Sequence, residues 1–449
     1  MQLRSIFART GAGLPPLITT TEPASVRASA TGGFFTRARS GRSPFLALLL
    51  MMLERIYSGV AGLLTFVGIG RVYGPAVAGD FAFATSTLML LAGFALVTCA
   101  QAIVPRMIAR PAIADRIANA VFLIRLAWCA MLLVIAAGLF MVELDGLRRT
   151  AALAIGSMVI VLEPFMVGSL LSQARGHFGQ IASVRLATAT ARLVVVVAGV
   201  LLRVPPAWLV LAWMAEHAVL VVLQVRIMGW MQPANRRILW RSARWRILKP
   251  YFVAGILFLP SMMAGQFFLR IDRLYLADAL PPDTYGVYAS GMQFLDAWLI
   301  IPQILGLVLS QRYLYSTTGK VTRRGAAILI AALGAAGIGG GFVVAEISIV
   351  VLPELLGQSF SRLHDILPWM FGYAAVNFLD YGLLLILMSM NLPGLILFKW
   401  LIASAVVVGT LLLLTPSLGA LAGPASLTVA LLVSDLFIAA VWKHHARSR

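Results

Sequence analysis

Twelve apolar runs, each about 20 residues long and separated by short polar segments, occupy most of this chain. An α-helix of ~20 apolar residues crosses a bilayer core of ~30 Å, so each run predicts one membrane-spanning helix. The predicted spans are residues 45 to 70, 81 to 105, 119 to 142, 150 to 170, 184 to 203, 207 to 227, 251 to 269, 287 to 311, 326 to 350, 363 to 388, 393 to 415 and 420 to 442. This pattern predicts an all-α polytopic membrane protein.

A short motif of the first half recurs in the second half. The segment from Tyr73 to Ala82 opens an apolar run, and the segment from Leu280 to Ala289 opens another. At one constant offset the matching residues are Pro75 with Pro282, Gly79 with Gly286, Phe81 with Tyr288 and Ala82 with Ala289. Internal repeats of this kind are common in transporters. The sequence therefore predicts two six-helix lobes, residues 45–227 and 251–442.

The remaining segments are polar and basic. Residues 1–44 are rich in Ser, Thr, Gly and Arg and predict a disordered cytoplasmic tail without a cleavable signal, with an organelle transit peptide as the alternative. Residues 228–250 predict a cytoplasmic linker that lies on the inner leaflet through its tryptophans and arginines. Residues 443–449 form a second short tail.

Composition and charge placement support this arrangement. A chain with 60% hydrophobic and 12% charged residues has too much apolar surface for a water-soluble globule. The net charge of +19 would suit a nucleic-acid partner, but the segments between spans hold Lys and Arg mostly on one face. By the positive-inside rule that face is cytoplasmic, which predicts an inner-membrane protein with both termini cytoplasmic and no nucleic-acid partner.

The sequence gives little support for catalysis. No predicted outer segment is long enough to fold into a domain, and the chain lacks P-loop, HExxH, CxxC and GxSxG motifs. Cys99 and Cys129 lie inside predicted spans without metal-ligand spacing. We therefore expect a transporter rather than an enzyme, with no catalytic residue, cofactor or metal site.

Ionisable residues within the spans are the main functional signal, because each costs ~2.5–3.5 kcal/mol at a helix centre. The cationic ones are Arg55, Arg125, Arg192 and Lys399, and the acidic ones are Glu54, Glu163, Glu216, Asp296, Asp380 and Asp435. Arg55 and Arg192 are the deepest. Arg125 and Lys399 lie near the predicted cytoplasmic edge, where a long side chain can instead snorkel to water; Asp435, also near an edge, is expected to be structural.

Three of the carboxylates have two interpretations. Glu216, Asp296 and Asp380 lie near the middle of predicted spans and are candidates for proton coupling. The alternative is that each forms an ion pair or hydrogen bond between helices and only holds the bundle together.

The charged sequence Arg270-Ile271-Asp272-Arg273, followed by Pro281-Pro282-Asp283-Thr284-Tyr285-Gly286-Val287-Tyr288-Ala289, resembles the polysaccharide-transporter branch of the multidrug/oligosaccharidyl-lipid/polysaccharide flippase superfamily. The resemblance covers residues 45–442 in layout. It implies MATE-like lobes around a V-shaped cavity whose basic residues hold a substrate pyrophosphate. Arg55, Arg270 and Arg273 match basic positions of that family, and Arg125 and Arg192 are added from their depth alone.

The resemblance implies a flippase that moves polyprenyl-pyrophosphate-linked oligosaccharide across the bacterial inner membrane, for O-antigen, capsule or exopolysaccharide synthesis, by alternating access. Its implied partners are that lipid, membrane lipids, and the polymerase and chain-length regulator of the same pathway. The alternatives are a multidrug/cation antiporter of the same superfamily, a membrane glycan polymerase or ligase, and a non-catalytic scaffold.

Overall fold

The computed structural model describes residues 44–98, 100–139, 146–229, 245–313, 323–389 and 393–447. Within these ranges the chain is almost entirely helical and contains no strand, which confirms the all-α prediction. Nearly all of the predicted tail 1–44, most of the predicted linker 228–250 and residues 448–449 lie outside the described residues.

The helices of the first half cover the predicted spans, but the second predicted span is interrupted between α3 and α4. They are α3 (Pro44–Ala95), α4 (Ala100–Ala109), η1 (Pro111–Ile113), α5 (Ala114–Leu139), α6 (Gly146–Leu162), η2 (Glu163–Met166), α7 (Val167–Ala174), α8 (Phe178–Leu201), η3 (Pro206–Leu209) and α9 (Val210–Ile227). Those of the second half are α11 (Trp245–Phe268), α12 (Ile271–Ala279), α13 (Pro282–Trp298), α14 (Ile300–Tyr313), α15 (Arg323–Ala335), η4 (Ala336–Gly340), α16 (Gly341–Leu356), η5 (Gln358–Phe360), α17 (Leu363–Ser389), α18 (Pro393–Leu418), η6 (Gly419–Leu421) and α19 (Ala422–Arg447).

Nine helical stretches of the described chain are long and apolar enough to cross a membrane, so this is a multi-pass membrane protein. Two of them, Met52–Ala95 and Gly394–Val441, contain 44 and 48 residues. Because ~20 residues suffice for one crossing, each of these is long enough for two. The α11 helix is not among the nine, and the count of twelve spans stays a prediction.

The predicted polar break between the first two spans is a sharp kink inside α3. Gly74 has φ 85° and ψ 174°, a conformation that glycine adopts without a Cβ clash. Pro75 follows at once, where its missing N–H costs the new helical segment nothing. In the second half the repeat-related Pro282 is likewise the first residue of a helix, α13. The two copies of the motif thus start helices in the same way.

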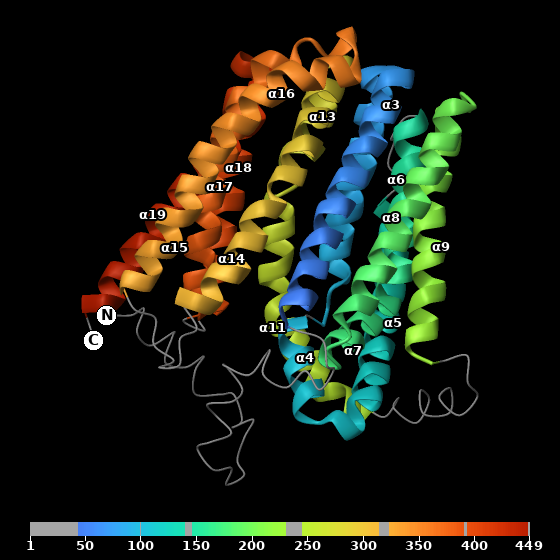
Figure 1. The fold of residues 1–449 in the computed structure, drawn as a ribbon, viewed down its shortest axis with the longest axis vertical. Coiled ribbons are helices and arrows are strands. Elements are labelled where there is room, and N and C mark those ends of the chain that lie inside the picture. Colours follow the sequence, from blue (N-terminus) through green and yellow to red (C-terminus); the bar gives the residue numbers. More distant parts are fainter. Residues whose placement is uncertain are drawn as a thin grey trace.

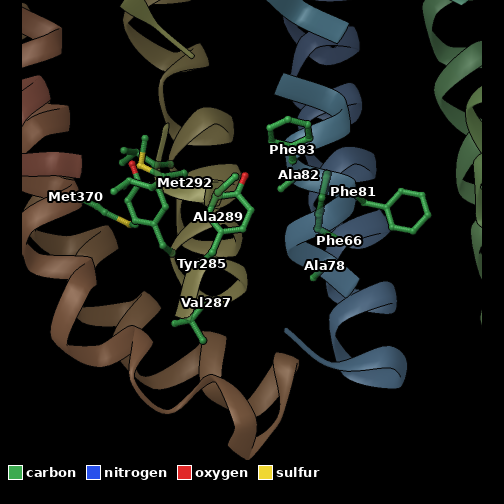
Figure 2. Packing of buried hydrophobic residues seen from close by; sticks show 14 of the residues in the cluster. Phe66, Ala78, Phe81, Ala82, Phe83, Tyr285, Val287, Ala289, Met292 and Met370 are labelled. Carbon is green, nitrogen blue, oxygen red and sulfur yellow. The ribbon is translucent and has the colours of Figure 1, made fainter. Parts of the chain in front are cut away.

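The helices form two groups that meet along α3 and α13. Figure 1 shows the first half, in blue to green, on one side and α13 to α19, in yellow to red, on the other. Side chains of α3 and α13, with Met370 of α17, belong to one buried apolar cluster (Figure 2). The repeat motif supplies Phe81 and Ala82 from one half and Tyr288 and Ala289 from the other, all fully buried.

Repeat-related glycines lie at a close approach of the two halves. A Cβ placed on Gly79 would lie 3.0 Å from the Cα of Gly286, and a Cβ on Gly286 would overlap the carbonyl oxygen of Pro75. Only glycine therefore fits at Gly286 while α3 and α13 keep this spacing. The positions matched by sequence meet each other in space.

Substituting Gly286 by alanine is expected to destabilise the protein by about 1–3 kcal/mol, because the added methyl group must push α13 away from α3. Thermal unfolding of the purified protein in detergent measures this loss. Gly409→Ala is the matched control, since nothing lies within 4 Å of a Cβ at that helical glycine. Equal unfolding temperatures for the two variants would contradict the close approach.

The α11 helix contacts both halves. It begins at Trp245 and so takes up the last residues of the predicted linker. Near its start, Arg106 of α4 donates a hydrogen bond to the carbonyl oxygen of Pro250 at 3.2 Å. Near its end, Ser404 of α18 donates one to the carbonyl oxygen of Ala264 at 3.3 Å. The two ends of one helix are thus held by different halves of the chain.

Candidate functional site

A cavity of about 330 Å³ lies where the two halves meet. Residues on both sides of the kink in α3 line it, together with side chains of α8, α9 and α13. Its polar lining residues are Ser58, Thr65, Thr85, Arg192, Arg270, Gln293 and Asp296. Two of the five predicted substrate-binding arginines therefore line one cavity, one from each half of the chain.

The first half contributes Arg192 of α8. Its Nη1 donates to Glu216 Oε2 of α9 at 2.9 Å, and the two side chains are 18% and 20% exposed. The Nε of Arg192 is buried and has no hydrogen-bond partner among the described atoms. Arg192 thus lines the cavity while its charge is paired with Glu216, and its Nε–H has no acceptor among the described atoms.

The second half contributes Arg270, which lies between α11 and α12 as the N-cap residue of α12. Its Nη1 donates to Asp296 Oδ2 at 2.7 Å. Arg273, one turn further on, donates to both oxygens of Asp296 at 2.7 and 2.8 Å. The side chain of Arg273 is 1% exposed and that of Arg270 is 16% exposed. Arg273 therefore anchors Asp296 from behind, while Arg270 borders the cavity.

Asp272 completes this charged group inside the protein. It is fully buried, its carboxylate lies 3.9 Å from Arg273 Nε, and it accepts a short hydrogen bond from the hydroxyl of Tyr288. Two arginines and two aspartates thus balance each other in charge. Buried ions need such pairing, because an isolated charge loses its hydration without compensation.

Arg55 lies one helical turn before the cavity-lining Ser58 on α3. Its Nη1 donates to Gln303 Oε1 of α14 at 3.2 Å, which is another contact between the halves. Among the residues that the structure describes, it has no acidic partner within ion-pair distance. The neighbouring Glu54 is instead paired with Arg185 at 3.5 Å. Arg55 therefore presents an uncompensated positive charge close to the cavity.

Arg125 lies outside this cavity, and its assignment as a substrate-binding residue stays a prediction. It is 1% exposed, so it does not snorkel, and it is not part of the cavity lining. It donates to Glu163 Oε1 at 2.8 Å and to the hydroxyl and carbonyl oxygens of Thr98 at 2.7 and 2.5 Å. Because α3 ends at Ala95 and α4 starts at Ala100, the Thr98 carbonyl is free of the helix and Arg125 satisfies it.

All three proton-coupling candidates form ion pairs between helices or helical segments. Glu216 pairs with Arg192, Asp296 with Arg270 and Arg273, and Asp380 of α17 with Lys399 of α18. The last pair is not part of the cavity lining, and Lys399 is fully buried rather than snorkelling. This arrangement agrees with the interpretation that the carboxylates hold helices together.

The predicted site residues are all ionisable, so the prediction did not include the uncharged polar residues of the lining. Gln293 donates to the hydroxyl of Thr85 across the interface at 3.3 Å. The available signal was spacing, since Gln293 and Asp296 are three residues apart and so share a face of α13.

The end of the bundle that is predicted to face outward is closed. Arg148 of α6 donates to Asp80 of α3 at 3.0 Å and reaches the second half at the Ala277 carbonyl and Asp278, at 2.9 and 3.2 Å. Arg71 of α3 donates to the carbonyl oxygen of Leu355 at 3.2 Å. Ion pairs and the glycine contact therefore hold the two halves together on that side.

Neither a protein-family model nor a curated protein sequence matches the chain. Solved structures do resemble it. The lipid II flippase MurJ in an inward closed conformation has a TM-score of 0.65 at 10% identity, covering 88% of this chain and 87% of that one. A eukaryotic MATE transporter has a TM-score of 0.56 at 14% identity, covering 94% and 97%. A MOP-superfamily transporter from Pyrococcus furiosus, described as having a binding pocket of reverse polarity, has a TM-score of 0.53 at 14% identity, covering 95% and 99%.

At these identities the likeness establishes the fold. The chain has the fold that MurJ and the MATE transporters share, which confirms the predicted MATE-like fold. Its assignment to the polysaccharide-transporter branch stays a prediction.

Proposed function

We propose that this protein moves a polyprenyl-pyrophosphate-linked oligosaccharide from the cytoplasmic to the outer leaflet of a bacterial inner membrane. In this proposal residues 45–227 and 251–442 act as two lobes that open the cavity alternately to each side, and both termini are cytoplasmic. The resemblance of the fold to a lipid II flippase supports a lipid-linked substrate. Oligosaccharides for O-antigen, capsule or exopolysaccharide are the candidate head groups.

The observation that carries the proposal is the placement of Arg192 and Arg270 on opposite sides of one interface cavity. Each uses Nη1 on a carboxylate and has a buried Nε–H without a partner among the described atoms. A guanidinium presents five donors in one plane, which match phosphate oxygens, and it stays charged when water is removed. Two such groups, with Arg55 nearby, favour an anionic head group.

The size of the cavity is consistent with a closed form of a transporter. Binding sites for drug-sized molecules measure ~300–1,000 Å³, so about 330 Å³ is at the lower limit even for a small ligand. An oligosaccharide head group therefore requires the lobes to separate, while the apolar polyprenyl tail stays in the lipid. The two lobes are held together at the end that is predicted to face outward. In this proposal they therefore separate first at the cytoplasmic side.

A multidrug/cation antiporter is the second candidate, because MATE transporters are also among the structural neighbours. An organic cation needs carboxylates or aromatic faces that are free to bind it. Phe66 and Trp213 supply aromatic faces to the cavity, but Asp296, the carboxylate among its described lining residues, is already held by two arginines. The charge pattern therefore favours an anion.

The deciding experiment uses purified protein in liposomes and two substrates. One is a fluorescent polyprenyl-pyrophosphate oligosaccharide whose leaflet is read with a membrane-impermeant quencher, and the other is a fluorescent organic cation. We expect the protein to move the anionic lipid faster than protein-free liposomes do and to leave cation uptake unchanged. Cation uptake without lipid movement would establish the antiporter instead.

A further inference from the structure

One hydrogen bond between the two halves lies on the side of the cavity that is away from the kink in α3. Arg55 lies one turn before Ser58 on α3, and Gln303 lies one turn after Ile300 on α14. Ser58 and Ile300 both line the cavity. Arg55 Nη1 donates to Gln303 Oε1 at 3.2 Å. This hydrogen bond, called the inner contact below, therefore borders the cavity from both halves of the chain.

The contacts at the opposite end, near the kink, are of a different kind. There Arg148 pairs with an aspartate of each half, Asp80 at 3.0 Å and Asp278 at 3.2 Å. It also donates to the carbonyl oxygen of Ala277 at 2.9 Å. An anion that approaches this end has to compete with two carboxylates. At the inner contact it has to compete only with one neutral amide oxygen.

The inner contact is accessible, and its positive charge is not neutralised. Gln303 is exposed and Arg55 is partly exposed. Among the residues that the structure describes, no carboxylate lies within ion-pair distance of Arg55. The neighbouring Glu54 is buried, accepts a hydrogen bond from Ser58 at 3.3 Å and pairs with Arg185 at 3.5 Å. Arg55 therefore carries its full charge at a place that a ligand can reach.

A phosphate group competes favourably with Gln303 for Arg55. Hydrogen bonds that involve an ionised acceptor are about twice as strong as neutral ones, and arginine binds phosphate through two parallel N–H groups. The Gln303 amide offers one neutral oxygen, at the long end of the usual range for N–H···O bonds. An anion that reaches Arg55 is therefore expected to displace Gln303.

Arg192 contacts the same face of α3 as Arg55. Gly62 lies two turns after Arg55, and a Cβ placed on Gly62 would be 3.7 Å from Arg192 Nη2. Because a helix rises about 1.5 Å per residue, the two arginines are separated by about 10 Å along α3. Gly62 lines the cavity together with Arg192 and Arg270. A head group that has reached Arg55 therefore lies next to the arginines of the cavity.

We infer that Gln303 holds Arg55 in the closed form and that a phosphate of the entering head group displaces it, so that the substrate itself releases the inner contact. A ligand shifts a conformational equilibrium only through its higher affinity for one form, and here the form with Arg55 released binds the anion better. Gln303 is then a positioning residue that does not bind the substrate. The identity of the anion rests on the proposed function.

Binding of inorganic pyrophosphate to the purified full-length protein, measured by calorimetry, tests the competition. Gln303 is exposed, so its variants should fold. Gln303→Ala frees Arg55 and should strengthen binding by about 2- to 10-fold, the range of one neutral hydrogen bond. Gln303→Glu gives Arg55 a charged partner and should weaken binding by about tenfold. Equal signs for the two changes, or an effect of Gln303→Ala that persists in an Arg55→Gln background, overturn the inference.

Disulfide cross-linking tests whether the anion separates the halves. A Cβ on Gly59 of α3 would lie 3.8 Å from the Cβ of Ala297 of α13, a distance that suits a disulfide. With Cys99 and Cys129 replaced by alanine, Gly59→Cys with Ala297→Cys should oxidise rapidly, and pyrophosphate should slow the reaction. Adding Gln303→Glu should keep oxidation rapid at the same pyrophosphate concentration. Oxidation that bound pyrophosphate leaves unchanged overturns the inference.

Transport in liposomes connects the inner contact to function. Gln303→Glu should move the anionic lipid more slowly than the wild type. The control Gln180→Glu adds the same charge to an exposed glutamine of α8, which accepts a hydrogen bond from Ser172 at 3.1 Å outside the cavity lining, and should not slow transport. If the wild type moves no anionic lipid, the proposed function fails, while calorimetry and cross-linking still decide the inner contact. Wild-type transport by Gln303→Glu overturns the inference and leaves the proposed function standing.

Discussion

Replacing Arg270 by glutamine is expected to lower transport of the anionic lipid by about 10- to 100-fold while the protein stays folded. A hydrogen bond to a charged group contributes about 1.5–3 kcal/mol, which corresponds to this range of rates. Some stability should be lost, because two aspartates then share one arginine, but Asp296 keeps its two hydrogen bonds from Arg273 and transport is therefore compared per folded molecule. The leaflet assay in liposomes measures the effect, with inserted protein quantified in the same preparation.

The matched control for Arg270→Gln is Arg175→Gln. Arg175 also pairs with an aspartate, Asp115, at 2.8 Å, but its side chain is 41% exposed and lies outside the cavity lining. We expect wild-type transport from this variant. Equal transport by both variants and the wild type would remove Arg270 from the proposed binding site.

Replacing Arg125 by methionine is expected to lower the free energy of unfolding by about 3–5 kcal/mol, because Glu163 and the carbonyl of Thr98 then lose their buried partner. The double variant Arg125→Met with Glu163→Met should recover part of this loss, since it removes both charges. Thermal unfolding in detergent measures both, and Arg175→Met, which breaks an exposed ion pair, should lose far less.

The same variants separate structure from substrate binding. If Arg125 only stabilises the break between α3 and α4, transport per folded molecule in the double variant should equal that of the wild type. A double variant that is stable but inactive would instead support the prediction that Arg125 binds substrate, which was made from its depth in the predicted span.

The layout of the chain was readable from the sequence because membrane insertion imposes a strong pattern. Apolar runs located the helices, and the offset of 207 residues between Gly79 and Gly286 pointed to two positions that meet in space. The predicted spans began later, at residues 81 and 287, whereas the helical segments start at Pro75 and Pro282, where a proline has no N–H to lose. Helix positions and the repeat depend on the local sequence and on the thickness of the bilayer. They do not depend on which distant residues come into contact.

The sequence did not predict which residues pair with the charged side chains. Arg125 and Arg192 look alike in sequence, since each lies well inside a predicted span. Arg125 is enclosed by Glu163 and Thr98, whereas Arg192 borders a cavity, and the difference arises from helices far away in the chain. Likewise, the spacing of Asp380 and Lys399 along the sequence gives no sign that they form an ion pair. Side-chain neighbours depend on helix rotation and tilt, which hydropathy does not fix.

The double attachment of α11 limits how the protein can change shape. The α11 helix is hydrogen-bonded to α4 near one end and to α18 near the other. The two halves therefore cannot move relative to each other without straining or bending α11. Pro260 lies between these two hydrogen bonds and removes one backbone hydrogen bond of α11 there, which favours bending at that turn. Bending at Pro260 would therefore let the distance between the halves change while both hydrogen bonds stay intact.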